Sequence, residues 1–179
     1  MANLWPGQYA GSLDTEIDVP SYISGYVDGE GCFTVSISPR PTLLVGWEVR
    51  PSLSVSQNGD RAEVLLLLQS YFGCGSLRPD RSDKTLKWET RNLSLLVERV
   101  IPHFETHPLL SGKQRDFQLF ASICVRMARK EHLTRSGLKS IVRLAGRMNP
   151  SGKRGYQPAT IIDLLSRDEG IVCPTRKSG

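Results

Sequence analysis

Apolar and polar residues alternate in two neighbouring stretches in the first third of the chain. Residues 33–38 carry apolar side chains at every second position, and residues 43–57 largely repeat this alternation. A period of two is typical of a strand with one apolar and one polar face. Pro39 and Pro41 lie between the two stretches and end the first one. We therefore predict a long hairpin whose apolar side faces a core.

A second hairpin and a series of helices complete the pattern. Residues 75–79 and 85–91 read as strands, joined by the polar segment 80–84. Helices are predicted at residues 22–29, 60–72, 92–104, 112–131, 134–147 and 158–166. Ser21 is the predicted N-cap of the first helix, and Gly73 is expected to end the second. This order of helix, hairpin, helix, hairpin and further helices predicts an α+β fold.

Charge is unevenly distributed along the 179 residues. The formal net charge is +5, and nine Lys or Arg residues with a single acid, Glu131, fall within residues 126–154. Such a basic segment is typical of nucleic-acid-binding proteins, although a solvated helix face can have the same composition. We expect three regions: a leader at 1–19, a core at 20–131, and a basic helical extension with a tail at 132–179.

Cysteine usage and hydropathy exclude several classes of protein. The four cysteines lie far apart without a C-x-x-C pair, which argues against a zinc ribbon or a disulfide scaffold and favours a reducing compartment. The first residues have no secretory signal pattern, and the longest apolar run, residues 64–68, is too short to span a membrane. We expect a protein of the cytoplasm or nucleoid, or of an organelle matrix if the gene lies in an organelle, with no membrane partner.

The segment Ile-Ser-Gly-Tyr-Val-Asp-Gly-Glu-Gly at residues 23–31 combines two unusual features. Gly25 and Gly29 lie four apart on a predicted helix, where small residues let another backbone approach closely. Asp28 and Glu30 lie at the C-terminal end of that helix, where the helix dipole disfavours anions and a cation would stabilise them. An ordinary helix end with a glycine cap and exposed acids is the alternative reading.

The nine residues resemble the motif that names the LAGLIDADG homing endonucleases. The glycines, the hydrophobic pair and both acidic positions match, with Glu30 in place of the more familiar aspartate and Ile23 and Ser24 as mild departures. The resemblance extends over residues 20–131 and implies an αββαββα core with an antiparallel β saddle. The helices beyond residue 131 would be additions to this core.

Family roles can be transferred to the matching positions of the motif. The resemblance implies that Glu30 is catalytic and binds a metal ion, with the backbone carbonyl of Gly29 as a second ligand. Asp28 and Gly25 would have structural roles at the motif. The implied metal is Mg²⁺; Mn²⁺ would be able to replace it, and Ca²⁺ would bind without turnover.

Three further catalytic residues are implied with less regular spacing. Gln57 closes the second strand, Arg61 follows four residues later, and Lys113 begins a helix after the second hairpin. In the family, residues at these places surround the active-site solvent. Each also has an ordinary alternative: a strand-end amide, a solvated helix start, and an exposed lysine.

A single copy of the motif implies a C2 homodimer, because the family builds one active pair from two motif helices. Such a dimer would hydrolyse both strands of a long, pseudo-palindromic double-stranded DNA site. The hairpins fit the major groove, and their polar sides would read base edges. The predicted readers are Thr34, Ser36, Ser38, Arg40, Glu48, Arg50, Ser52, Ser54, Arg78, Asp80, Thr85, Lys87 and Glu89. The predicted phosphate contacts in the basic segment are Arg143, Arg147, Lys153 and Arg154.

Two other functions on the same fold remain open from the sequence. An RNA maturase would bind its intron RNA, with or without DNA cleavage, and a non-cleaving regulator would bind a DNA site without needing metal. His103 and His107 are not predicted to bind zinc, because prolines flank them and no thiol ligand lies nearby.

Overall fold

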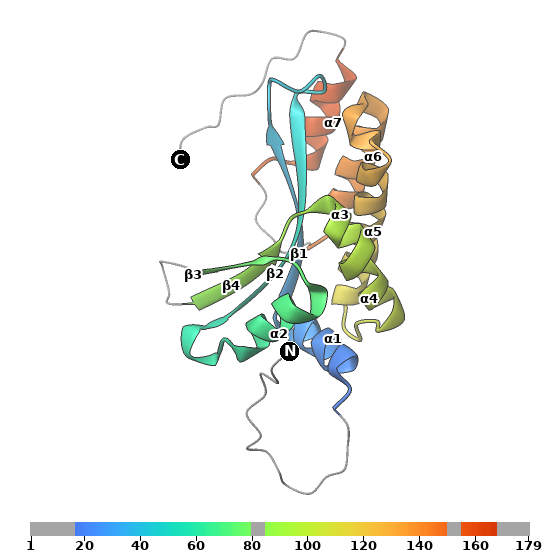
Figure 1. Ribbon diagram of the computed structural model, residues 1–179. Helices are drawn as coiled ribbons and strands as arrows, with labels where there is room; N and C mark the ends of the chain where they lie inside the picture. The colour runs from blue at the N-terminus through green and yellow to red at the C-terminus, as the bar shows by residue number, and fades with distance from the viewer. Residues whose placement is uncertain (1–16, 80–84, 150–154, 168–179) are drawn as a thin grey trace, which may run out of the picture.

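The computed structural model describes residues 17–79, 85–149 and 155–167 (Figure 1). Its elements, in chain order, are α1 (Val19–Glu30), β1 (Gly31–Pro39), β2 (Trp47–Asn58), η1 (Gly59–Arg61), α2 (Glu63–Phe72), β3 (Ser76–Pro79), β4 (Thr85–Thr90), α3 (Leu93–Leu95), η2 (Leu96–Val100), α4 (Ile101–Thr106), α5 (Lys113–Ala128), η3 (Glu131–Leu133), α6 (Arg135–Gly146) and α7 (Pro158–Ser166). The α+β fold and its element order are as predicted. Predictions for Asp80, Lys153, Arg154 and the side chain of Arg61 lie outside the described part of the chain.

The first helix starts earlier than the sequence suggested, and the prediction of Ser21 as its N-cap was wrong. α1 begins at Val19, and Asp18 is the cap: its Oδ1 accepts a hydrogen bond from the backbone N–H of Ser21 at 3.2 Å. Pro20 falls in the first turn, where its missing N–H costs nothing. Gly73, in contrast, ends α2 as predicted, with a left-handed φ of 58°.

Four antiparallel strands form one sheet in the order β1-β2-β4-β3. β2 begins at Trp47 rather than near residue 43, because residues 40–46 form a turn closed by a 2.8 Å bond from the Arg40 N–H to the Gly46 carbonyl. Gly46 has a φ of 72°, which favours glycine. The register pairs Phe33 with Leu53 and Thr34 with Ser52, so each predicted face keeps to one side of the sheet.

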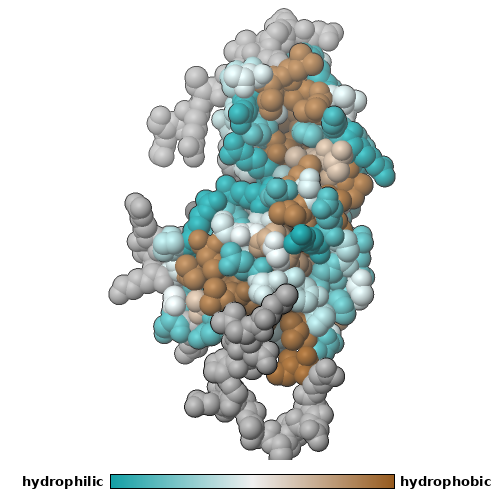
Figure 2. Space-filling model, in the orientation of Figure 1, coloured by the Kyte–Doolittle hydropathy of each residue, from teal (hydrophilic) through white to brown (hydrophobic). Residues whose placement is uncertain are grey.

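The apolar side of the sheet packs on the helices. Phe33 makes ring contacts with Phe104, Phe117 and Phe120, at centroid distances of 5.2 to 5.5 Å. Trp88 of β4 is fully buried on the same side and donates its indole N–H to the Cys74 carbonyl. Because side chains alternate across a strand, the predicted base-reading residues on the four strands point away from this helical layer. On the surface, apolar patches are separated by polar residues (Figure 2).

The helix predicted at 92–104 contains a π-helical turn between α3 and α4. The Ile101 N–H bonds to the carbonyl of Leu96, five residues back. Pro102 follows and has no N–H to continue the ordinary i to i−4 ladder. The wider turn lets the chain pass this proline and continue into α4, which carries His103 into the core.

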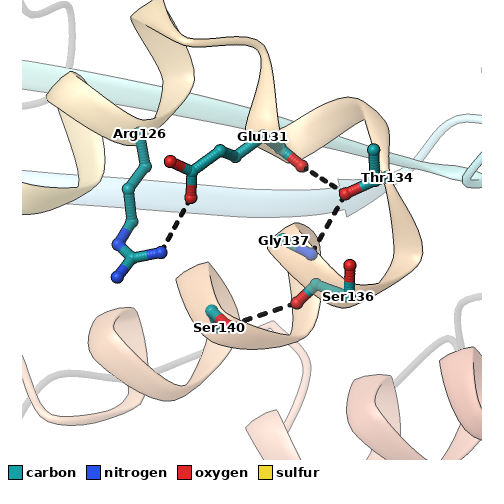
Figure 3. A network of polar contacts seen from close by, with 6 residues as sticks. All are labelled: Arg126, Glu131, Thr134, Ser136, Gly137 and Ser140. Atoms are coloured by element: carbon teal, nitrogen blue, oxygen red, sulfur yellow. Dashed lines mark hydrogen bonds and ion pairs between the residues drawn. The ribbon is translucent and has the colours of Figure 1, made fainter.

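The C-terminal helices lie alongside the outer half of the β1–β2 hairpin (Figure 1). α6 packs against α5 and α7. Its start is fixed by Thr134, whose hydroxyl accepts from the Gly137 N–H and donates to the Glu131 carbonyl (Figure 3). Arg126 at the end of α5 binds the Glu131 carboxylate at 2.7 Å. These contacts join the extension to the rest of the chain, and the predicted division at residue 131 stays a prediction.

Candidate active site and nucleic-acid interface

The C-terminal end of α1 carries the motif acids and receives a lysine from a distant helix. Gly29 and Glu30 are exposed. The Lys113 ammonium donates to the Val27 carbonyl at 3.0 Å and to the Gly29 carbonyl at 3.3 Å. A positive charge is favourable there, because the last carbonyls of a helix carry partial negative charge. The fold thus brings Lys113 to the residue before Glu30.

Asp28 fastens the motif helix to the segment that leads into α5. Its carboxylate accepts from the backbone N–H groups of Leu110 at 3.0 Å and Ser111 at 2.9 Å, and from the Ser111 hydroxyl. Partial burial raises the pKa of Asp28, but these hydrogen bonds and the Lys113 charge outweigh it, and the pKa lies below its ordinary value. Since Lys113 follows Ser111 by two residues, the same contacts position the lysine.

Gln57 reaches α1 from the end of β2. Its amide nitrogen donates to the Tyr26 hydroxyl at 2.5 Å, and its amide oxygen accepts from the Asn58 N–H at 2.9 Å. Tyr26 lies one helical turn before Glu30. Gln57 and Lys113 are therefore both held against the motif helix, and their catalytic roles stay predictions. The backbone of Arg61 lies in η1, directly after β2.

One face of α1 is left uncovered by the part of the chain that the structure describes. Gly25 and Gly29 are exposed, and a Cβ built at either would meet no atom within 4 Å. Tyr22, on the same face, is 49% exposed. Among the described residues, no three His, Cys, Asp or Glu side chains gather closely enough to hold a metal ion. At the end of α1, the Glu30 carboxylate and the Gly29 carbonyl are exposed oxygen donors, whereas the Asp28 carboxylate is already bound to residues 110 and 111.

The polar face of the sheet brings together most of the predicted base-reading residues. The register aligns Ser36 with Arg50, Ser38 with Glu48, Ser54 with Glu89, Ser56 with Lys87 and Arg78 with Lys87. Thr34, Arg78 and Thr85 retain exposed or part-exposed surface, whereas Ser52 is buried, with 9% exposure. This face is a continuous set of hydrogen-bonding groups, and contact with bases stays a prediction.

Two predicted readers on this face are carboxylates already bound to arginines. Glu48 binds Arg40 and Arg50, each at 2.7 Å. Glu89 binds Arg91 through both of its oxygens, at 2.9 and 3.0 Å. The sequence reasoning missed Arg91, although it continues the every-second-residue pattern of Lys87 and Glu89 by one step.

Arg143 and Arg147 are exposed on or just after α6, which belongs to the helical layer rather than to the polar face of the sheet. No contact among the described residues brings either of them to the motif helix. Their contact with phosphates stays a prediction.

The buried side chain of His103 on α4 joins α1 and α2. The sequence analysis considered His103 only as a zinc ligand and did not predict these contacts. The ring of His103 lies 3.1 Å from the Ser24 hydroxyl through Nε2 and 3.0 Å from the Tyr71 hydroxyl through Nδ1. Ser24 donates its own hydrogen to the His107 carbonyl, so Nε2 carries the proton and Nδ1 accepts from Tyr71. Burial, aided by the nearby His107, lowers the pKa of His103 to about 4.

None of the helices in the described ranges has the length and hydropathy needed to cross a membrane.

Comparison with known proteins connects this geometry to a family. The family described as LAGLIDADG endonuclease matches residues 23–124, more than half of the chain. A protein of Neurospora crassa named probable intron-encoded endonuclease 2 is 32% identical over 131 residues, which are 73% of this chain and 29% of that protein.

Two solved structures share the fold and part of the sequence. The crystal structure of the homing endonuclease I-TnaI has a TM-score of 0.73 and 34% identity, covering 86% of this chain and 99% of that one. The archaeal intron-encoded homing endonuclease I-Vdi141I, solved in complex with DNA, has a TM-score of 0.75 and 26% identity, covering 82% and 93%. The chain thus spans nearly the whole of these two structures, but less than a third of the Neurospora protein.

Proposed function

The chain belongs to the LAGLIDADG endonuclease family, and from this premise we propose that it is a site-specific homing endonuclease that cuts double-stranded DNA as a homodimer. The observation that carries the proposal is the end of α1, where Glu30 is exposed and Lys113 binds the carbonyls beside it. The chemistry is phosphodiester hydrolysis. Water adds to phosphorus, the bond to O3′ breaks, and O3′ takes a proton, which leaves a 5′ phosphate and a 3′ hydroxyl.

A divalent cation is the proposed cofactor, and Mg²⁺ fits the donors best. The Glu30 carboxylate and the Gly29 carbonyl would hold it, since both are hard oxygen ligands. When bound, the cation lowers the pKa of the attacking water and stabilises the leaving oxygen. Mn²⁺ shares this preference for oxygen, whereas Ca²⁺ is expected to support binding without turnover.

Three side chains complete the proposed machinery. Lys113 is held at the end of α1 by two carbonyls, so its charge can offset the negative charge that builds on the scissile phosphate. Gln57 donates one amide hydrogen to Tyr26, and its second remains for the active-site water. The backbone of Arg61 lies in η1, directly after β2, and the proposed role of this residue rests on the family resemblance alone.

Dimer formation is proposed through the uncovered face of α1. Gly25 and Gly29 leave room for a second helix to approach, and a second copy would bring two Glu30 residues together near the dyad. The two polar sheet faces would then lie along one DNA duplex and read the two halves of a pseudo-palindromic site. I-Vdi141I, which has the same fold, was solved in complex with DNA.

A cleavage assay on a randomised double-stranded DNA library tests this proposal. The protein is incubated with Mg²⁺, with Ca²⁺ and with chelator, and cut molecules are sequenced. Cutting at one long, near-palindromic sequence in Mg²⁺ alone is the expected result. Selective binding without cutting would instead favour the maturase or regulator function, and intron RNA would then be tested.

The variant Glu30→Gln provides the sharpest single test of the active site. It keeps the size of the side chain and removes its charge, so we expect DNA binding to persist while cleavage falls by several orders of magnitude. Asp163→Asn, which removes an exposed carboxylate on α7, is the matched control and should cut normally. Undiminished cutting by Glu30→Gln would remove Glu30 from the mechanism.

A further inference from the structure

The outer end of the β1–β2 hairpin carries two arginines that share one carboxylate. Arg40 Nη1 lies 2.7 Å from one oxygen of Glu48, and Arg50 Nη2 lies 2.7 Å from the other. The two arginine side chains are 48% and 53% exposed, whereas Glu48 is 23% exposed. Partial burial raises the pKa of Glu48, but the two guanidinium groups outweigh it and hold the pKa below its ordinary value. Glu48 therefore stays ionised and holds both arginines.

The opposite face of the same hairpin end is anchored to the C-terminal part of the chain. Trp47 and Val49 are buried at 3% and 6% exposure, and Trp47 packs edge-on against Tyr156 at 5.3 Å. Nearer the motif end of β1, an edge strand, Asn149 donates its side-chain amide to the Phe33 carbonyl at 2.8 Å. The backbone N–H of Asn149 in turn donates to Oδ1 of Asp116 on α5, at 3.1 Å. The hairpin that carries the two arginines is thus packed against the C-terminal part of the chain on its opposite face.

We propose that Arg40, Glu48 and Arg50 form one preorganised unit that reads guanine in the outer part of each DNA half-site, an inference that rests on the proposed function. A guanidinium matches the O6 and N7 acceptors of guanine in the major groove. The Glu48 contacts engage one terminal nitrogen of each arginine, and each guanidinium has further N–H groups on a side chain that is about half exposed. Glu48, expected from the sequence to contact bases itself, is then a positioning residue.

The position of the unit predicts where these guanines lie. β1 runs for nine residues from the motif to the hairpin turn. At about 3.3 Å per residue, the unit lies roughly 25 Å along the sheet from Glu30. With a base-pair rise of about 3.4 Å, this corresponds to roughly 5 to 9 base pairs from the cut phosphate.

The test compares the base preferences of the wild type and two variants, each as the whole 179-residue chain. Wild type, Glu48→Gln and Arg50→Lys are each incubated with the randomised duplex library in Ca²⁺, and bound DNA is sequenced. The wild type is expected to select guanine at one or two outer positions of each half-site. Arg50→Lys keeps the charge but loses the planar fork, so guanine preference should fall roughly 5- to 100-fold at those positions. Glu48→Gln should lower it at the same positions and leave the inner consensus readable.

A matched ion pair elsewhere serves as the control. Asp163 and Arg167 on and after α7 form an exposed pair at 2.6 Å, so Asp163→Asn removes a similar contact without touching the hairpin. Its selected sequence should equal that of the wild type. A wild-type consensus without outer guanines, or one that both hairpin variants retain, would overturn this inference while leaving the proposed function intact. No consensus in any sample would instead overturn the proposed function.

Discussion

At the scale of single residues, Asp28 connects the motif to the rest of the proposed active site. Its carboxylate holds residues 110 and 111, and Lys113 follows directly on α5. These contacts support the structural role that the resemblance implies for Asp28, and that role stays a prediction. The charge of Asp28 matters because its carboxylate accepts three hydrogen bonds. Two of them come from the backbone N–H groups of residues 110 and 111, which have no other acceptor among the described contacts.

The variant Asp28→Asn tests this support. An amide can keep some of these bonds but not the charge, so we expect a stability loss of about 1 kcal/mol. Displacement of Lys113 should lower the single-turnover cleavage rate roughly 10- to 100-fold with little change in DNA affinity. Thermal unfolding and single-turnover kinetics measure the two effects. A normal cleavage rate would show that Asp28 does not position Lys113.

The lowered pKa of His103 predicts that the stability of the fold depends on pH. Its pKa is about 4 in the folded chain and about 6.5 when free. Between these values the unfolded chain binds the proton and the folded chain does not, so stability is complete above pH 6.5 and falls as the pH drops towards 4. The loss should reach about 2 to 3 kcal/mol.

Urea unfolding at pH 7.5, 6.0 and 4.5 measures this dependence. His103→Gln keeps a donor and an acceptor but does not titrate, so its stability should change less over the same range. Equal slopes for the two proteins would assign the acid sensitivity to other groups.

At the scale of elements, the C-terminal helices support the outer half of the β1–β2 hairpin. A two-stranded ribbon is marginally stable alone, and here the part of the hairpin beyond the other two strands packs on Tyr156 through Trp47 and lies alongside α6 and α7 (Figure 1). The sequence analysis predicted these helices, but the only role that it proposed for this region was phosphate contact by the basic segment. Their observed packing gives them a structural role that their basic charge did not reveal.

The variant Tyr156→Leu tests this packing. Loss of the Trp47 contact should cost about 1 kcal/mol and raise hydrogen exchange in residues 37–49. If base reading depends on this support, discrimination at the outer base pairs should fall as well. Leu133→Ala, at an exposed residue of the same extension, is the control. Unchanged exchange in the hairpin would show that the helices do not hold it.

At the scale of the whole molecule, the proposed dimer depends on α1. The face with Gly25 and Gly29 is open among the described residues, so a larger side chain there meets none of them before a second copy approaches. Folding and assembly should therefore respond in opposite directions to the same substitution.

Gly25→Leu makes this contrast measurable. Replacing a helical glycine should stabilise the monomer by up to about 1 kcal/mol, yet the added side chain should block close helix contact. Light scattering should show a shift from dimer to monomer, and cleavage should be lost. Gly155→Leu, at an open glycine outside α1, should remain dimeric. A dimeric Gly25→Leu protein would place the interface elsewhere.

The sequence alone determined the strand faces, the helix order and the motif, because each depends on local periodicity or on adjacent residues. Alternation put Phe33 and Thr34 on opposite sides of the sheet, and the spacing of residues 23–31 identified the family. The same local reasoning misplaced the start of α1, since several residues near Pro20 can act as a cap, and it started β2 too early, since a turn through Gly46 depends on its φ.

Only the tertiary structure decided which distant groups meet. Lys113 reaches Gly29 across more than eighty residues of chain, and His103 finds Ser24 and Tyr71 on two other helices. The fold of the hairpin likewise put Glu48 between Arg40 and Arg50, and this ion-pair geometry is the basis for proposing Glu48 as a positioning residue. Such contacts follow from how helices and strands pack together, and packing is set by the whole core rather than by any local pattern.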